Sequence, residues 1–180
     1  MSKGKVTTFA GNHDEHMRRY VQALLIGNLR DYVRSARALP ADGADVYRTM
    51  LNLSLAAQGY WEHATEGDSN AANALRRAGT TNIKINGEIT DGYRHFTTTS
   101  SKHVTEHTPK RTREIFAGEG VETRAVYHPQ VHLEGGSVNY NDVIKDVITQ
   151  ISTHAVSCGW MTDDDQAERD ALLAELVIAP

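Results

Sequence analysis

The 180-residue chain has the length of one domain, and its 39% of apolar residues suffice to form a buried core. Its net charge of −4 argues against a general affinity for nucleic acid or for anionic membranes. A single cysteine, Cys158, excludes an internal disulfide and metal sites built from paired cysteines. The sequence contains neither a long apolar run nor a secretory signal behind its N-terminal lysines, so we expect a cytoplasmic protein without a membrane span.

Two long helices are predicted in the N-terminal part of the chain. Apolar residues recur at steps of three and four over about residues 13–38 and again over about 45–66. Asn12 stands at an N-cap position with Glu15 three residues later, and Pro40 ends the first helix. Because the connection between the helices is short, they should form an antiparallel hairpin.

The pattern changes after a shorter helix that is predicted over about residues 69–78. Residues 82–89 hold an Asn-Gly pair between short apolar runs, which predicts a tight β-hairpin. Residues 93–99 and 121–133 are rich in Thr, Val and aromatic residues and predict strands. Pro129 indicates that the second of these strands is an edge strand or is interrupted, since proline donates no ladder hydrogen bond.

The most unusual segment is 97–114, in which Val104 is the only strongly apolar residue. Such a segment cannot bury itself and is too long for a routine connection. Two interpretations remain open: a surface loop, or a mildly basic arm that becomes ordered against an acidic or phosphate-bearing partner. The candidate contact residues of this arm are Lys102, His103, His107, Lys110, Arg111 and Arg113.

Helical spacing returns near the C-terminus, over about residues 142–158 and 163–177, with Asn141 and Thr162 as the expected N-caps. We therefore expect an α+β fold in one domain, residues 1–180. Its N-terminal helical hairpin should pack with C-terminal helices, and a central antiparallel β element should carry the long polar arm. The parts are a helical region, a β insertion and the C-terminal helices, at 1–79, 80–140 and 141–180.

Charge is distributed unevenly along the chain. Residues 1–40 hold seven Lys or Arg and three Asp or Glu, whereas residues 141–180 hold two and eight. One interpretation is that the two ends lie near each other within the fold, or are simply solvated. The other is a head-to-tail contact, in which the basic end of one copy meets the acidic end of the next and builds a ring or a filament.

Nine histidines raise the alternative of a metal site. His128 and His132 are four residues apart in a predicted strand and therefore share a face. With a third histidine, of which His63 is the main candidate beside His95 and His154, they could bind zinc or another divalent transition metal. The sequence has no HEXXH motif. Three further residues have simpler expected roles: helix capping for His13 and His16, and inert packing in the core for the thiol of Cys158.

These observations favour a non-enzymatic, homo-oligomeric assembly or interaction protein without a cofactor. A helical core with a projecting β arm suits a subunit that locks onto its neighbours, like the connector or neck components of virus particles; this is a fold-level analogy. Such a protein would be cytoplasmic, or assembled into a particle formed in the cytoplasm. Two alternatives are a histidine-ligated, metal-dependent hydrolase and a small inhibitor or regulator that docks on a partner protein.

Overall fold

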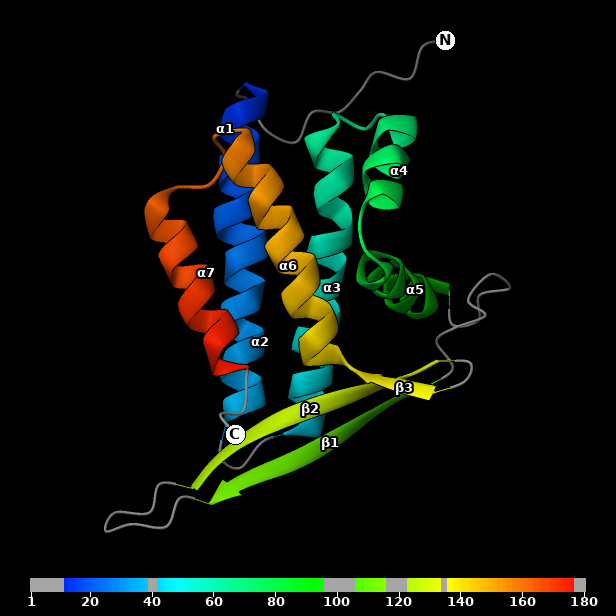
Figure 1. The fold of residues 1–180 in the computed structure, drawn as a ribbon, viewed down its shortest axis with the longest axis vertical. Coiled ribbons are helices and arrows are strands. Elements are labelled where there is room, and N and C mark those ends of the chain that lie inside the picture. The colour runs from blue at the N-terminus through cyan, green and yellow to red at the C-terminus, as the bar shows by residue number, and fades with distance from the viewer. Residues whose placement is uncertain (1–11, 39–41, 96–105, 116–122, 134–135, 177–180) are drawn as a thin grey trace.

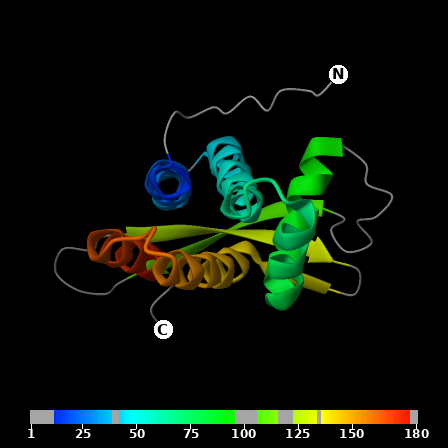
Figure 2. The ribbon, with the colours of Figure 1, turned by 90° about the horizontal axis from the view of Figure 1, so that it is seen from above.

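The computed structural model describes residues 12–38, 42–95, 106–115, 123–133 and 136–176 (Figure 1). Helices make up most of the fold, and a three-stranded antiparallel sheet lies across one end of them. The predicted α+β class is confirmed. Viewed along the bundle in Figure 2, α2 and α3 form one layer, α6 and α7 form the other, and α4 and α5 lie to one side. No helix in the described ranges has both the length and the apolar character needed to cross a membrane.

The predicted N-terminal helical hairpin is confirmed. Its first arm is a continuous helical rod in three parts, α1 (His13–Arg19), the π-helical turn η1 (Tyr20–Ile26) and α2 (Gly27–Arg37), and its second arm is α3 (Gly43–Ala64). The side chain of Asn12 caps the rod by accepting a hydrogen bond from the backbone N–H of Glu15 at 2.8 Å. The carboxylate of Glu15 pairs with Arg19 one turn later. Pro40 lies outside the described residues.

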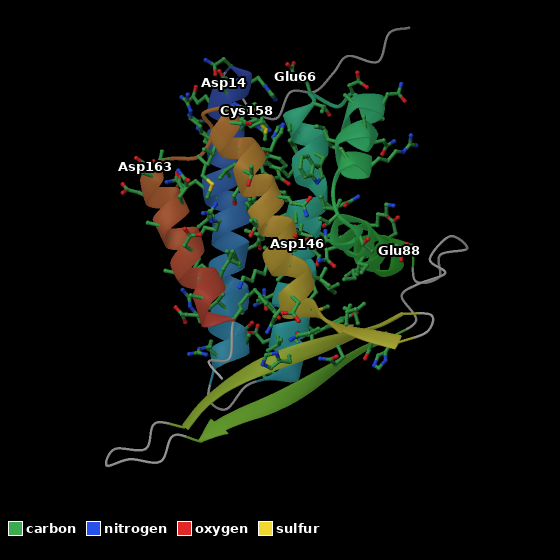
Figure 3. The ribbon with its side chains drawn as sticks, viewed as in Figure 1. Asp14, Glu66, Glu88, Asp146, Cys158 and Asp163 are labelled. Carbon is green, nitrogen blue, oxygen red and sulfur yellow. The ribbon has the colours of Figure 1, made fainter. Side chains whose placement is uncertain are left out.

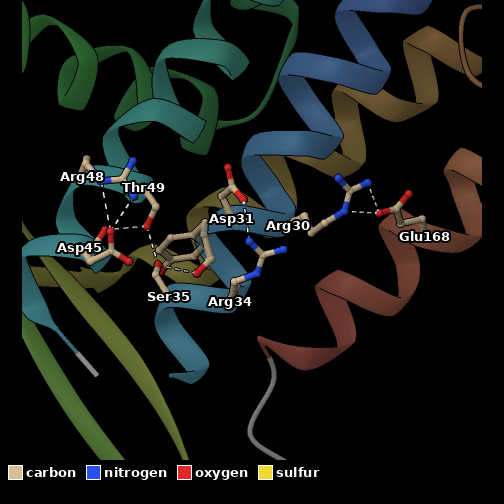
Figure 4. A network of polar contacts seen from close by, with 9 residues as sticks. Arg30, Asp31, Arg34, Ser35, Asp45, Arg48, Thr49 and Glu168 are labelled. Atoms are coloured by element: carbon tan, nitrogen blue, oxygen red, sulfur yellow. Dashed lines mark hydrogen bonds and ion pairs between the residues drawn. The ribbon is translucent and has the colours of Figure 1, made fainter. Parts of the chain in front are cut away.

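The two arms of the hairpin are joined by a buried hydrogen bond of 2.6 Å between Ser35 of α2 and Thr49 of α3, shown in Figure 4.

The basic and acidic ends of the chain also meet. In the same view, Arg30 of α2 forms an ion pair with Glu168 of α7. Because the basic N-terminal rod faces the acidic C-terminal helix, the interpretation that the two ends meet within one fold is confirmed.

Helix α4 (Ser69–Ala78) follows the prediction, but α5 (Thr81–His95) corrects it. The β-hairpin predicted over residues 82–89 is wrong, and residues 93–95 of the next predicted strand also belong to α5. The buried residues of this segment recur at steps of three and four, and α5 packs on α3 and α6. Burial of this helical face overrides the local preference of Asn-Gly for a turn.

The C-terminal helices are α6 (Tyr140–Ser157) and α7 (Asp163–Glu175). The N-cap of α6 is Asn139, whose side chain accepts from the N–H of Asn141. The predicted cap, Asn141, is instead a buried residue of the first turn. Thr162 caps α7 as predicted. The core between the two helical layers includes Leu29, Tyr32, Met50, Leu53, Ile144 and Ile148.

The cap of α7 provides a first test. The Thr162 hydroxyl accepts from the N–H of Asp165 at 3.1 Å, and the Asp165 carboxylate accepts from the N–H of Thr162 at 2.9 Å. Thr162→Ala should therefore lower the free energy of unfolding by about 1 kcal/mol in a urea titration. Thr153→Ala, on the exposed side of α6, should change it by less than about 0.5 kcal/mol. Equal effects of the two substitutions would contradict the capping role.

The sheet contains β1 (Glu106–Ile115), β2 (Thr123–Leu133) and β3 (Gly136–Asn139), in the order β1-β2-β3. Strand β1 pairs with β2 along the whole length of β1, but β3 pairs only with residues 130–133 of β2. Pro129 comes directly before the residues that pair with β3. At Pro129, β2 therefore has a strand partner on one side, which is β1. The prediction of an edge or interrupted strand therefore holds only at Pro129 itself, because β2 as a whole is the central strand and runs through Pro129 without a break.

Candidate functional site

The β1–β2 hairpin (residues 106–115 and 123–133) is the first candidate site, because the described helices support it through β2. Within the part of the chain that the structure describes, β1 packs mainly on β2, whereas β2 also packs on α2 and α6. Figure 1 shows the hairpin crossing the end of the bundle with β1 as the outermost element. Among the described strands, residues 123–129 of β2 pair with β1 alone. Much of the hairpin is therefore a two-stranded ribbon.

Two prolines fix the hydrogen-bonding pattern of this ribbon. Pro109 and Pro129 are direct partners in the register. Since proline has no N–H, this pair is best placed at a non-hydrogen-bonded position, where both backbones direct their polar groups away from each other. Alternation then places Arg111 and Arg113 at positions whose backbone N–H and C=O point away from β2. These groups form an edge to which another chain can bind.

Most of the predicted arm residues fall on this edge strand. His107, Lys110, Arg111 and Arg113 belong to β1, while Lys102 and His103 lie outside the described residues. The two strands carry four basic and two acidic residues. Four of the six predicted arm residues thus belong to the outer strand, and their contact with a partner stays a prediction.

A buried polar chain anchors the hairpin to the helices. The Nδ1 atom of His128 accepts a hydrogen bond from Asn139 at 2.9 Å, and the side-chain nitrogen of Asn141 lies 3.4 Å from the same atom. Asn141 in turn accepts from the hydroxyl of Tyr32 on α2. Since Nδ1 is the acceptor, the proton of the neutral imidazole resides on Nε2. His128 therefore has a structural role that joins β2 to α6 and α2.

The structure does not bring the predicted metal-binding histidines together. His128 and His132 lie on β2, whereas His63 lies in the last turn of α3, at the end of that helix farthest from the sheet (Figure 1). Across the described residues, no group of three or more His, Cys, Asp or Glu side chains is arranged to hold a metal ion. His63 belongs instead to a different site.

That site is a histidine cluster formed by His13, His16 and His63, where the first turn of α1 meets the last turn of α3. His16 Nε2 and His63 Nδ1 lie 2.9 Å apart, and His13 Nε2 lies 2.9 Å from the backbone carbonyl oxygen of His63. Figure 3 shows this end of the bundle, with Asp14 and Glu66 labelled. The predicted helical hairpin contained the signal for this cluster, because antiparallel helices of these lengths place residues 13–16 beside the end of α3.

Aromatic rings extend the cluster towards α6. Trp160 packs edge-on against His13 at 5.4 Å and against His154 at 5.7 Å between ring centroids. The indole N–H of Trp160 donates to Asp14 at 2.8 Å, and His154 Nδ1 lies 2.8 Å from the Tyr60 hydroxyl. His154 is therefore a hydrogen-bonded and partly buried residue at the junction of α3 and α6.

Cys158 corrects a prediction. Its thiol is exposed at the C-cap of α6, and Sγ lies 4.0 Å from His154 Nε2. The expectation of a buried packing thiol is wrong. Helix α6 ends at Ser157, one residue earlier than predicted, so Cys158 is the C-cap residue and does not lie on the buried face of the helix.

Burial lowers the pKa values of two histidines at this end of the bundle. Desolvation lowers the pKa of His63, with smaller contributions in the same direction from His16 and His13 and an opposing one from Glu62. Desolvation also lowers the pKa of His154. Both imidazoles therefore favour the neutral form in the folded state.

Comparison with protein-family models, with curated proteins and with solved structures finds no significant match to this chain. The functional argument therefore depends on the geometry of the hairpin and of the histidine cluster.

Proposed function

We propose that this chain is a non-enzymatic subunit of a homo-oligomeric assembly, comparable in role to connector or neck components of virus particles. The observation that carries this proposal is the β1–β2 hairpin, whose outer strand packs mainly on one other strand. An isolated two-stranded ribbon is marginally stable in water, and an exposed strand edge is a template for pairing with another chain. Contact with a neighbouring subunit would stabilise the ribbon and would pair the backbone groups of its outer edge.

The chain itself offers a complementary surface for the hairpin. Helix α7 carries six acidic residues and one arginine, and the side chains of Asp163, Asp164 and Asp170 are exposed. The basic hairpin of one copy can therefore face the acidic helix of another. Because the two surfaces differ, the contact is heterologous and leads to a ring or a filament. Its charge complementarity implies that assembly weakens as the salt concentration rises.

A substitution that removes one outward backbone N–H tests the role of the β1 edge. Arg111→Pro removes that donor, whereas Arg111→Ala removes the same side chain and keeps the donor. Loss of one hydrogen bond of about 1.4 kcal/mol should raise the concentration at which the assembly dissociates about tenfold for the proline variant relative to the alanine variant. Native mass spectrometry over a dilution series measures the oligomer populations of both variants and of the parent chain.

The outcomes of this experiment separate two failures. A parent chain that remains monomeric at all concentrations would contradict the assembly proposal. Equal dissociation of the two variants would retain the assembly and exclude backbone pairing at the edge. The far-ultraviolet circular dichroism of both variants should match that of the parent chain, because residue 111 donates no hydrogen bond to β2 in the inferred pattern.

A further inference from the structure

Helix α1 is joined to the rest of the bundle in an unusual way. It is separated from α2 by the π-helical turn η1, and π-helical turns are frequent at functional sites and are one cause of helix kinks. The side chain of Met17 is fully buried, and polar contacts hold the remainder of α1. These contacts join His13 and His16 to His63, Asp14 to Trp160, and Arg18 to the carbonyl of Gly159.

The contact between His16 and His63 depends on protonation. At 2.9 Å, one imidazole nitrogen must donate a proton and the other must accept it. A neutral imidazole can do either, but two protonated rings present only donors and carry two positive charges at the same place. The hydrogen bond therefore exists only while at least one ring is neutral.

The surrounding groups offer limited compensation for added positive charge. Glu66 lies 4.0 Å from His13 Nδ1 and is largely exposed, and Glu62 is engaged by Arg76 of α4 at 2.9 Å. The ring of Tyr20 packs against His63 at 4.6 Å between centroids, and burial raises the pKa of its phenol, so it stays neutral. Among the described residues, the titratable and charged groups around the pair include His13, Tyr20, Glu62, Glu66 and, through Glu62, Arg76.

We infer that the His16–His63 contact is an acid-sensitive latch, which holds α1 against the end of α3 near neutral pH and releases it on acidification. On release, α1 moves about η1 while α2, α3 and α6 keep their packing. This property is independent of the proposed assembly role, because the latch lies at the end of the bundle opposite the sheet (Figure 1).

The direction of the pH effect follows from linkage. The pKa of His63 in the folded protein lies below its ordinary value of 6.5, so the unfolded or released state binds the proton more readily. The stabilisation is complete above pH 6.5 and is lost as the pH falls through the lowered value. His154, whose pKa is also lowered, changes stability in the same direction through the Tyr60 and Trp160 contacts.

Hydrogen–deuterium exchange with mass spectrometry tests the latch on the full chain. Labelling at pH 7.5 and pH 5.5, with times corrected for the intrinsic pH dependence of exchange, gives protection factors for peptides from α1, α2 and α6. For the parent chain we expect the protection of α1 to fall between pH 7.5 and pH 5.5, whereas the protection of α2 and α6 should stay unchanged. EDTA in all buffers removes divalent ions, which could bridge the same two nitrogens.

His63→Gln supplies an amide that does not titrate, and it should remove most of the pH dependence of α1 protection; the remainder comes from His154 through Trp160. His132→Gln on β2 is the matched control and should behave like the parent chain. A pH dependence in His63→Gln as large as in the parent chain, constant protection in the parent chain, or an equal loss in α1, α2 and α6 would each overturn the latch. If His63→Gln does not fold, His16→Gln provides the same test from the other side of the contact.

Discussion

Replacing Asn141 by alanine should lower the free energy of unfolding by about 2–4 kcal/mol, since buried polar partners then lose their hydrogen bonds. Asn141 is 3% exposed and accepts a hydrogen bond from Tyr32, whose side chain is also fully buried. Its side-chain nitrogen lies 3.4 Å from Nδ1 of buried His128. Alanine leaves the Tyr32 hydroxyl without this acceptor in an apolar setting. Urea unfolding monitored by tyrosine and tryptophan fluorescence measures the change.

Two controls identify the cause of the Asn141 effect. Asn52→Ala, on the exposed face of α3, should be neutral or slightly stabilising because alanine is the better helix former. Tyr32→Phe should cost at least about 0.5 kcal/mol less in the Asn141→Ala background than in the parent chain, since its partner is already absent. Additive effects would show that the two side chains do not depend on each other.

The helices with long apolar stripes were predictable from the sequence, and α5 was not. Over a window of eight residues, Ile83, Ile85 and Ile89 fit a strand hairpin around Asn-Gly as well as they fit a helix. A tertiary contact favours the helix: Asn86 is 2% exposed and donates to the backbone carbonyl of Ser54 at 3.1 Å. That acceptor is 32 residues away in the sequence, so no local pattern contains the information.

The two candidate sites differ in how far the sequence could predict them. Residues 97–114 stood out in the sequence only through their polarity. An outer strand need not bury apolar residues, so its sequence can be as polar as that of a loop, and polarity cannot distinguish the two. The histidine cluster follows from the predicted pairing of the first two long helices and not from any local motif, because His16 and His63 are 47 residues apart. The spacing of His128 and His132 correctly placed both on one strand, yet spacing cannot say that Asn139 and Asn141 would engage His128.

Tyr140→Ala should give the largest loss of stability among the substitutions considered, about 3–5 kcal/mol, because it removes a fully buried aromatic ring at the junction between β3 and α6. The ring packs edge-on against Tyr32 at 5.4 Å between centroids. The Tyr140 hydroxyl donates to the carbonyl of Met50 at 3.0 Å and lies 2.7 Å from Ser54 Oγ, which therefore donates to it. Burial raises the pKa of this phenol, so it remains a donor throughout the physiological range.

Tyr140→Phe separates the two contributions at this position. It keeps the ring and removes the hydroxyl, so it should cost about 1–3 kcal/mol, the range for a lost buried hydrogen bond. Tyr47→Ala, at a tyrosine that is 40% exposed on α3, is the matched control and should cost much less than Tyr140→Ala in the same urea titration. If Tyr140→Phe were as damaging as Tyr140→Ala, the hydrogen bonds to Met50 and Ser54 would hold the sheet end of α6 in place. If it were neutral, the packing of the ring alone would do so.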